Sequence, residues 1–269
     1  MAPHAKPHAF EWSASGRVDA VSAEQPDQHL DPDVARVYDD RSDAPQSDPA
    51  VIAATVDCLA DLADGGRAVE FAIGTGRVAL PLAAAGVEVH GIELSEPMLE
   101  QMRRKPGGTD IPVTVGDMTS TSVGTGFSLA YLVYNTISNV QTQAGQVACF
   151  RNAAAHLRPG GRFVIELLVP DPPRRDDPER YRPFHVGDDH VGIDEYVDRT
   201  HQTQISHHVW PNRSVKRRVS GRFRYVWPSE LDLMAQLAGM ELEHRWADWN
   251  RSEFTDTSSS HVSVWRRVD

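Results

Sequence analysis

The stretch Glu70-Phe71-Ala72-Ile73-Gly74-Thr75-Gly76-Arg77 decides the fold, because it joins an apolar run to a helical segment through a glycine-rich turn. Glycines are needed in such a turn where a flat, polar ligand that bears a nucleoside lies against the backbone and a Cβ would collide. Ala79 stands where the third glycine of a dinucleotide fingerprint would fall. Taken alone, the pattern leaves NAD, FAD and a purely structural turn open.

On both sides of this turn, short apolar runs alternate with amphipathic stretches, which predicts an α/β fold with a mostly parallel, doubly wound sheet. The expected strands are 68–72, 88–92, 113–115, 129–134 and 162–168. The expected helices are 33–38, 49–63, 77–85, 97–105 and 143–157. Residues 170–190 are expected to form a loop, and β-type alternation then predicts antiparallel strands over 192–199, 203–210 and 214–227. A helix over 229–238 and strands over 242–246 and 261–266 follow.

Composition narrows the class of protein. The 269-residue chain has a net charge of -11 at pH 7, which argues against broad binding to a phosphate backbone, so we predict no nucleic-acid partner. Cys58 and Cys149 lie among apolar neighbours without metal-ligand spacing and are predicted to be reduced core residues. No apolar run approaches the length of a membrane span, and the first residues lack the apolar core of a signal peptide. We therefore predict a cytoplasmic location and no membrane partner.

Three acidic positions bear on the nucleotide ligand: Glu93 indicates a ribose, and Glu70 and Asp117 discriminate between cofactors. Glu93 follows Gly76 by 17 positions at the end of a strand, where a carboxylate accepts hydrogen bonds from both ribose hydroxyls of either a nicotinamide or an adenosylmethionine cofactor. Glu70 lies inside the strand before the glycines, where a cationic ligand head gains from a carboxylate and a pyrophosphate does not. Gly116-Asp117-Met118 would supply a carboxylate for an adenine amino group and a thioether for its ring. For Glu93, a capping or solvated carboxylate is the alternative.

With these motifs in order, residues 36–170 resemble the class I S-adenosylmethionine-dependent methyltransferases, including the turn into the fifth strand at Arg158-Pro159-Gly160-Gly161. The resemblance implies a Rossmann-like, seven-stranded sheet whose last strand inserts antiparallel. It also implies roles at the matched positions. The loop from Ala72 through Gly74 and Thr75 to Gly76 would hold the amino-acid part of S-adenosyl-L-methionine, Glu93 the ribose, and Asp117 with Met118 the adenine. Leu94 and Met98 would wall the adenine, and Tyr38 would close over the methionine end.

The β-rich insert after the fifth strand resembles, in layout, that of small-molecule N-methyltransferases acting on amino sugars or on glycine and sarcosine. We divide the chain into a flexible tail over 1–30, a cofactor-binding core over 31–170, an insert over 171–228 that covers the acceptor, and residues 229–269, which complete the core. The sequence carries no signal for an oligomeric state.

Methyl transfer from a sulfonium needs alignment and a dry pocket, with a base only when the nucleophile is protonated. The acceptor pocket is expected over the carboxyl ends of the strands, which places Tyr134 and Asn135 near the transferred methyl. Asn135 would position the acceptor or form a turn. His185 is the candidate general base, with a structural histidine as the alternative. His207 and His208 alternate across a strand, so we predict no metal site.

Residues 201–269 carry ten basic and eight acidic residues, so this part of an acidic chain is mildly basic. Strand alternation places Arg218, Arg222 and Arg224 on one face and Arg217 on the other. These arginines would bind an anionic acceptor, or they would charge an edge strand against sheet-to-sheet pairing.

We therefore expect a methyltransferase that moves a methyl group to N or O of a small-molecule acceptor. A nicotinamide-dependent oxidoreductase and a non-catalytic, cofactor-binding regulatory protein of the same fold are the alternatives.

Overall fold

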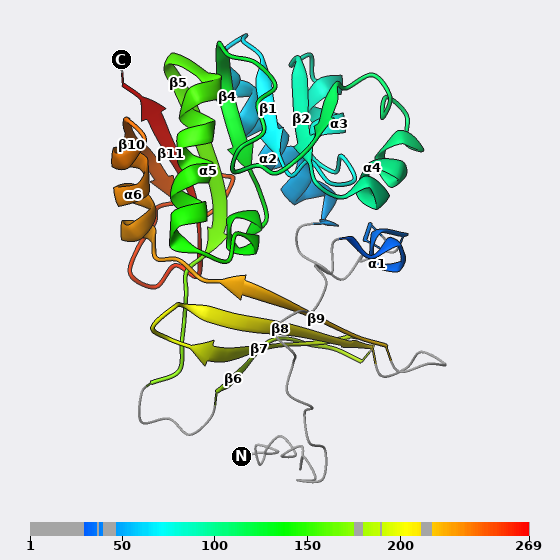
Figure 1. Cartoon of the computed structure of the whole chain (residues 1–269), viewed down its shortest axis with the longest axis vertical. Helices are drawn as coiled ribbons and strands as arrows, with labels where there is room; N and C mark the ends of the chain where they lie inside the picture. Colours follow the sequence, from blue (N-terminus) through cyan, green and yellow to red (C-terminus); the bar gives the residue numbers. More distant parts are fainter. Residues whose placement is uncertain are drawn as a thin grey trace, which may run out of the picture.

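A computed structural model describes residues 30–36, 38–39, 47–174, 180–188, 190–210 and 217–268, without the side chains of 217 and 218. The tail predicted over 1–30 lies, apart from Leu30, outside the described residues. The large sheet has the strand order β10-β11-β5-β4-β1-β2-β3 (Figure 1). Its strands are β1 (Ala68–Phe71), β2 (Val89–Glu93), β3 (Val113–Val115), β4 (Phe127–Leu132), β5 (Leu157–Leu168), β10 (Met240–Trp246) and β11 (Ser260–Arg267). β11 pairs antiparallel with β5 and with β10, while β1 to β5 pair in parallel, as predicted.

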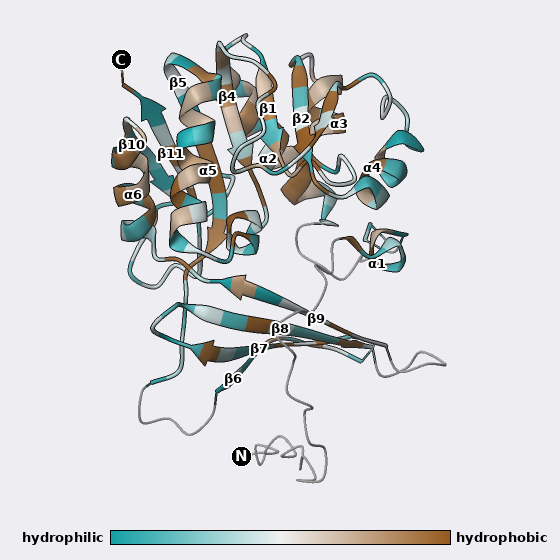
Figure 2. Ribbon diagram, in the orientation of Figure 1, coloured by the Kyte–Doolittle hydropathy of each residue, from teal (hydrophilic) through white to brown (hydrophobic). Residues whose placement is uncertain are grey.

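Helices cover both faces of this sheet. The helices are α1 (Pro32–Arg36), α2 (Pro49–Ala63), α3 (Ala79–Ala84), α4 (Glu96–Arg103), the 3-10 helix η3 (Thr136–Asn139), α5 (Gln143–His156) and α6 (Pro228–Leu237). One core cluster joins α2, α3 and α4 to one face, and a second joins α5 and α6 to the other. In β4, Leu129 and Tyr131 belong to the first cluster and Ala130 and Leu132 to the second, because successive side chains alternate across a strand. Figure 2 shows hydrophobic residues along the central strands of the large sheet, β1, β4 and β5.

Local signals account for where α2 and α3 begin. Asp48 caps α2 by accepting a hydrogen bond from the backbone N–H of Ala50, and Pro49 takes the first helical position. α3 begins at Ala79, two residues later than expected, because Gly76 has a φ of +75° and carries the turn onward. Both cysteines are reduced and buried, as predicted.

A second sheet of four antiparallel strands lies beyond the carboxyl ends of β4 and β5 (Figure 1). Its strands, in spatial order, are β6 (Tyr181–Val186), β7 (Val191–Asp198), β8 (Thr203–Trp210) and β9 (Arg217–Arg224). The expectation of a loop over 170–190 is wrong at β6, an edge strand whose Pro183 lacks a backbone donor, which an edge position tolerates. The strand expected at 162–168 already begins at Leu157, so the predicted turn with Gly160 is an irregularity within β5.

Among the described residues, no helix is both long enough and apolar enough to cross a membrane.

Candidate functional site

The glycine-rich turn after β1 combines an open side with a packed side. Ala72, Gly74 and Gly76 all have positive φ angles, of 54°, 59° and 75°. A Cβ added to Gly74 would have only the carbonyl oxygen of Ala72 within 4 Å, at 3.9 Å, whereas one on Gly76 would meet Leu80 and Met102 at 3.0 Å. Gly74 therefore leaves room for a ligand against the backbone, and Gly76 allows the turn to pack on the helices.

Glu93 connects this turn to the end of β2. Its Oε2 accepts a hydrogen bond of 2.7 Å from the backbone N–H of Gly74, and its Oε1 accepts one of 2.8 Å from the N–H of Ser95. The residue is 6% exposed. The carboxylate is therefore held in one orientation at the carboxyl edge of the sheet.

Glu70 lies beneath the turn in a fully buried environment. The hydroxyl of Tyr131 donates a 3.0 Å hydrogen bond to its Oε2. Burial raises the pKa of Glu70 to about 8, although the bond from Tyr131 and the charge of Arg77 act to lower it. At neutral pH the carboxyl therefore favours its protonated form unless a cation approaches it.

The segment that holds Tyr38 is tied to the glycine-rich turn by its neighbour Asp39. Oδ1 of Asp39 accepts a 2.7 Å hydrogen bond from the hydroxyl of Thr75, and its Oδ2 forms a 2.6 Å ion pair with Lys105. Lys105 also donates to the carbonyl oxygen of Thr75, at 2.7 Å. Sequence reasoning selected Tyr38 and Thr75 but missed Asp39 and Lys105, because their charges alone gave no sign of a partner so far away in sequence.

The predicted adenine residues follow β2 and β3, whose ends are joined by a 2.9 Å bond from the N–H of Gly116 to the carbonyl of Glu93. Leu94 is 51% exposed and Met98 is buried, so of these two Leu94 offers apolar surface to a ligand at this edge. Asp117 is exposed and caps its own turn by accepting from the N–H of Thr119 at 2.7 Å. Met118 is partly buried and packs against the second core cluster.

After β4 the chain makes a turn of two consecutive left-handed residues, Tyr134 and Asn135, with φ angles of 54° and 58°. The side-chain oxygen of Asn135 accepts a 2.7 Å hydrogen bond from the N–H of Leu168 at the end of β5. The guanidinium of Arg77 lies 5.7 Å from the centre of the Tyr134 ring. The structure thus brings Tyr134 to the glycine-rich turn and shows Asn135 bracing two strand ends.

His185 lies in the small sheet. Its ring stacks on that of His190, with centroids 4.9 Å apart, and His190 Nε2 lies 3.0 Å from His208 Nδ1. His207 instead contacts the Ser220 hydroxyl at 2.8 Å, which agrees with the predicted alternation of His207 and His208. Within the described parts of the chain, no group of His, Cys, Asp and Glu side chains could hold a metal ion.

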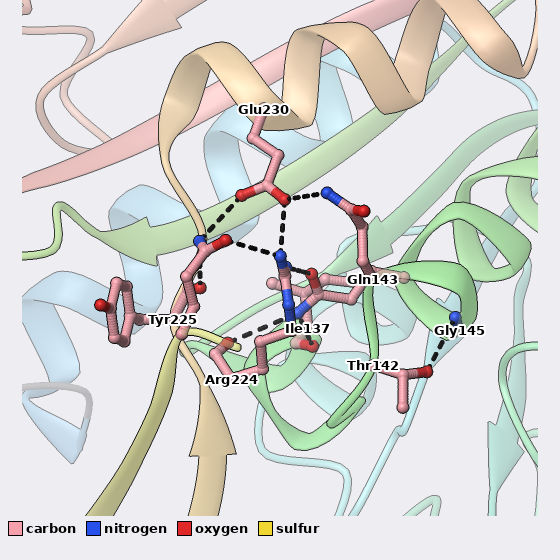
Figure 3. A network of polar contacts seen from close by, with 9 residues as sticks. Ile137, Thr142, Gln143, Gly145, Arg224, Tyr225 and Glu230 are labelled. Carbon is pink, nitrogen blue, oxygen red and sulfur yellow. Dashed lines mark hydrogen bonds and ion pairs between the residues drawn. The ribbon is translucent and has the colours of Figure 1, made fainter. Parts of the chain in front are cut away.

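Arg224 joins the small sheet to the core (Figure 3). Its guanidinium forms a 2.6 Å ion pair with Glu230 of α6 and donates to Gln146 of α5 and to Gln202. Gln143 adds a 2.7 Å hydrogen bond to Glu230. The register of β9 has no bulge, so positions 218, 222 and 224 fall on the same face of the strand, as predicted. β9 is an edge strand of the small sheet. Arg224 is buried in this network, so the interpretation of all three as acceptor ligands is wrong for Arg224.

Comparison with known proteins identifies the family of this chain. A family model described as a methyltransferase domain matches residues 68–161. The CcbJ methyltransferase from Streptomyces caelestis is 34% identical, with a TM-score of 0.79 over 90% of this chain and 99% of that one. The chain belongs to the S-adenosylmethionine-dependent methyltransferases. This membership decides against the nicotinamide-dependent oxidoreductase and the non-catalytic protein as alternatives.

Two curated relatives of this methyltransferase have names that state what they methylate. The cypemycin N-terminal methyltransferase of a Streptomyces species is 26% identical over 66% of this chain and 74% of its own length. The dTDP-4-amino-2,3,4,6-tetradeoxy-D-glucose N,N-dimethyltransferase of Saccharopolyspora spinosa is 33% identical over 50% of this chain and 54% of its own length.

Proposed function

We propose that this methyltransferase methylates an amine nitrogen of a small-molecule acceptor, of the amino-sugar class. The observation that carries the proposal is that the amino-sugar relative is named as an N,N-dimethyltransferase; the cypemycin relative is named as an N-terminal methyltransferase. The small sheet over the carboxyl edge supports a discrete acceptor, because it adds a wall where open α/β sheets bind their ligands.

The cofactor would occupy the edge formed by the turns after β1, β2 and β3. Gly74, Thr75 and Gly76, with Ala72, would hold its amino-acid part, because Gly74 leaves the backbone open to close approach. The oriented carboxylate of Glu93 would bind the ribose hydroxyls. The exposed apolar surface of Leu94 and the neighbouring Asp117 and Met118 would receive the adenine, with Met98 packed beneath.

Two tyrosines would enclose the methionine end. Asp39, bound to Thr75 and Lys105, holds the segment of Tyr38 against the glycine-rich turn. Tyr134 reaches it from β4 and lies beside Arg77. Buried Glu70 would then lie beneath the cationic amino group, whose charge favours the ionised carboxylate.

When bound, S-adenosyl-L-methionine supplies a methyl group on a sulfonium. The protein aligns the acceptor so that the amine lone pair forms the N–C bond as the C–S bond breaks, and it excludes water. The nitrogen must be unprotonated to attack, and the proton it loses needs an acceptor. We propose His185 as the base. We propose Asn135 as a group that positions the methyl acceptor, and its hydrogen bond from the N–H of Leu168 fixes its side chain.

If the acceptor is anionic, such as a nucleotide-linked sugar, Arg222 of β9 would bind its negative charge, because the side chain of Arg222 is exposed. We also propose that the enzyme is cytoplasmic and has no nucleic-acid or membrane partner, because the chain has a net charge of -11 and no apolar run long enough to span a membrane.

The test is to incubate the protein with S-adenosyl-L-methionine and matched acceptors: a nucleotide-linked amino sugar, the free amino sugar, and the hydroxyl analogue of each. We expect S-adenosylhomocysteine to form in proportion to an acceptor that gains one or two methyl groups on nitrogen, located by mass spectrometric fragmentation. Methylation of the hydroxyl analogues at equal rates would contradict the choice of nitrogen.

A further inference from the structure

The turn after β4 is conformationally unusual, and its position makes that matter. Tyr134 and Asn135 both adopt left-handed φ angles, 54° and 58°, although neither is glycine. A left-handed conformation is unfavourable for a bulky residue such as Tyr134 and persists there only where neighbouring groups enforce it, whereas Asn adopts it more readily. Something outside this turn must therefore hold it.

Glu166 of β5 supplies that restraint through its side chain and its backbone. Its Oε2 accepts a 2.8 Å hydrogen bond from the N–H of Tyr134, and its carbonyl oxygen accepts a 3.1 Å bond from the N–H of Asn135. β4 and β5 are paired in parallel, so both strands end at the same edge of the sheet. Both backbone donors of the turn are thus satisfied by one residue of the neighbouring strand.

The carboxylate is itself fixed from the other side. Trp249, in the connection between β10 and β11, donates from Nε1 to Oε1 of Glu166 at 2.9 Å, and this tryptophan is 5% exposed. Each carboxylate oxygen therefore faces one N–H donor. A carboxylate can accept at both oxygens, whereas a glutamine amide has one oxygen and would turn its own N–H groups toward one of the donors.

We propose that Glu166 is a positioning residue for methyl transfer: it holds Tyr134 and Asn135 in the left-handed turn that aligns the acceptor with the methyl group. The proposal rests on the proposed location of the site at this turn. Glu166 itself does not touch the reacting atoms in this account, and Trp249 serves to orient its carboxylate.

Glu166→Gln is the main test, because it keeps the size of the side chain and removes one acceptor. A cavity of about 120 Å³ lined by Glu166, Trp249 and Val51 gives the altered side chain room to adjust. We expect kcat to fall by about 10- to 100-fold, as for a displaced positioning group. The dissociation constant of S-adenosylhomocysteine should rise by less, about two- to fivefold, because Tyr134 is displaced at the methionine end while the glycine-rich turn and Glu93 are untouched.

Two further variants separate positioning from general stability. Trp249→Phe removes only the second donor, so it should lower kcat in the same direction but by less. Glu243→Gln removes a carboxylate that is bonded to Arg162 of β5 at 2.7 Å, away from the turn, and should leave kcat unchanged even if the melting temperature falls. A loss of kcat that tracks the melting temperature across all three variants would overturn the proposal.

Glycine provides a rescue test, since it adopts the left-handed conformation without help. The carboxylate of Glu166 restrains Tyr134, so in the Tyr134→Gly background, whose own activity serves as the reference, Glu166→Gln should cost less than it does in the wild type. An equal cost in both backgrounds contradicts a role in enforcing the turn. If S-adenosylhomocysteine binds none of the proteins, including the wild type, the proposed cofactor site fails instead.

Discussion

The hydroxyl of Tyr131 donates a 3.0 Å hydrogen bond to the carboxyl of Glu70, and both side chains are buried beneath the glycine-rich turn. Two neighbouring parallel strands, β1 and β4, contribute these residues, so the pair forms the floor of the proposed cofactor site. The floor of that site therefore carries a carboxyl group that is costly to ionise.

Glu70→Gln should change how stability depends on pH in the cofactor-free protein. The pKa of Glu70 in the folded protein, about 8, lies above its ordinary value of 4.5. Its contribution to stability is therefore full below pH 4.5 and is lost as the pH rises through about 8. Glutamine does not titrate, so between these pH values the free energy of unfolding of the variant should rise relative to that of the wild type by on the order of a few kcal/mol. Chemical denaturation at several pH values measures the difference.

Tyr131→Phe is the matched control for this effect. Removing the hydroxyl removes a bond that lowers the pKa of Glu70, so in Tyr131→Phe the loss of stability with rising pH should be larger than in the wild type and should extend to higher pH. Parallel stability curves for the wild type and Glu70→Gln would show that the carboxyl does not titrate in this range.

Glu93→Gln should weaken the binding of S-adenosylhomocysteine by about 10- to 100-fold, because hydrogen bonds to a charged group contribute about 1.5–3 kcal/mol. Isothermal titration calorimetry measures the affinity directly. Glu88→Gln is the control, since this exposed carboxylate beside His90 precedes the opposite end of β2. Tight binding that is indifferent to the change at Glu93 would rule out our ribose site.

Asp39→Asn should lower the affinity for S-adenosylhomocysteine about two- to fivefold, the size expected from a half-exposed ion pair. The amide would lose the ion pair with Lys105 but could still accept from the Thr75 hydroxyl. The effect should shrink at high salt. Asp33→Asn breaks the exposed pair with Arg36 in α1 and should leave the affinity unaltered. Equal effects of the two changes would remove Asp39 from the site.

Arg224→Met should destabilise the protein by about 3–5 kcal/mol, because it leaves Glu230 without its cationic partner in a network that is largely buried. Arg222→Met, two positions earlier on the same parity of β9, should change stability by less than about 0.5 kcal/mol. Denaturant titration compares the two variants. Similar losses from both would indicate that the network in Figure 3 is not what joins the sheets.

Arg222→Met also tests whether the acceptor is anionic. Arg222→Met should raise KM for a nucleotide-linked amino sugar and leave KM for the uncharged sugar unchanged. An unchanged KM for both acceptors would show that Arg222 does not bind an anion.

Local signals in the sequence by themselves determined the order of the strands and helices apart from β6, the open turn at Gly74 and the placement of Glu93 at a strand end. These features depend on neighbours in sequence: the alternation of apolar residues, helix caps and the freedom of glycine. The membership in the methyltransferases followed from the same motifs. The edge strand β6 was missed because its Pro and polar residues are typical of a loop.

Only the tertiary structure decided which distant side chains meet. Asp39 reaches Thr75 across 36 positions, Glu166 reaches Trp249 across 83, and Arg224 turns from the predicted acceptor face into the core to bind Glu230. Periodicity states which face of a strand a residue occupies, but not what covers that face. That depends on how the whole chain packs, because a buried charge or strained turn is stable only where folding brings it a partner.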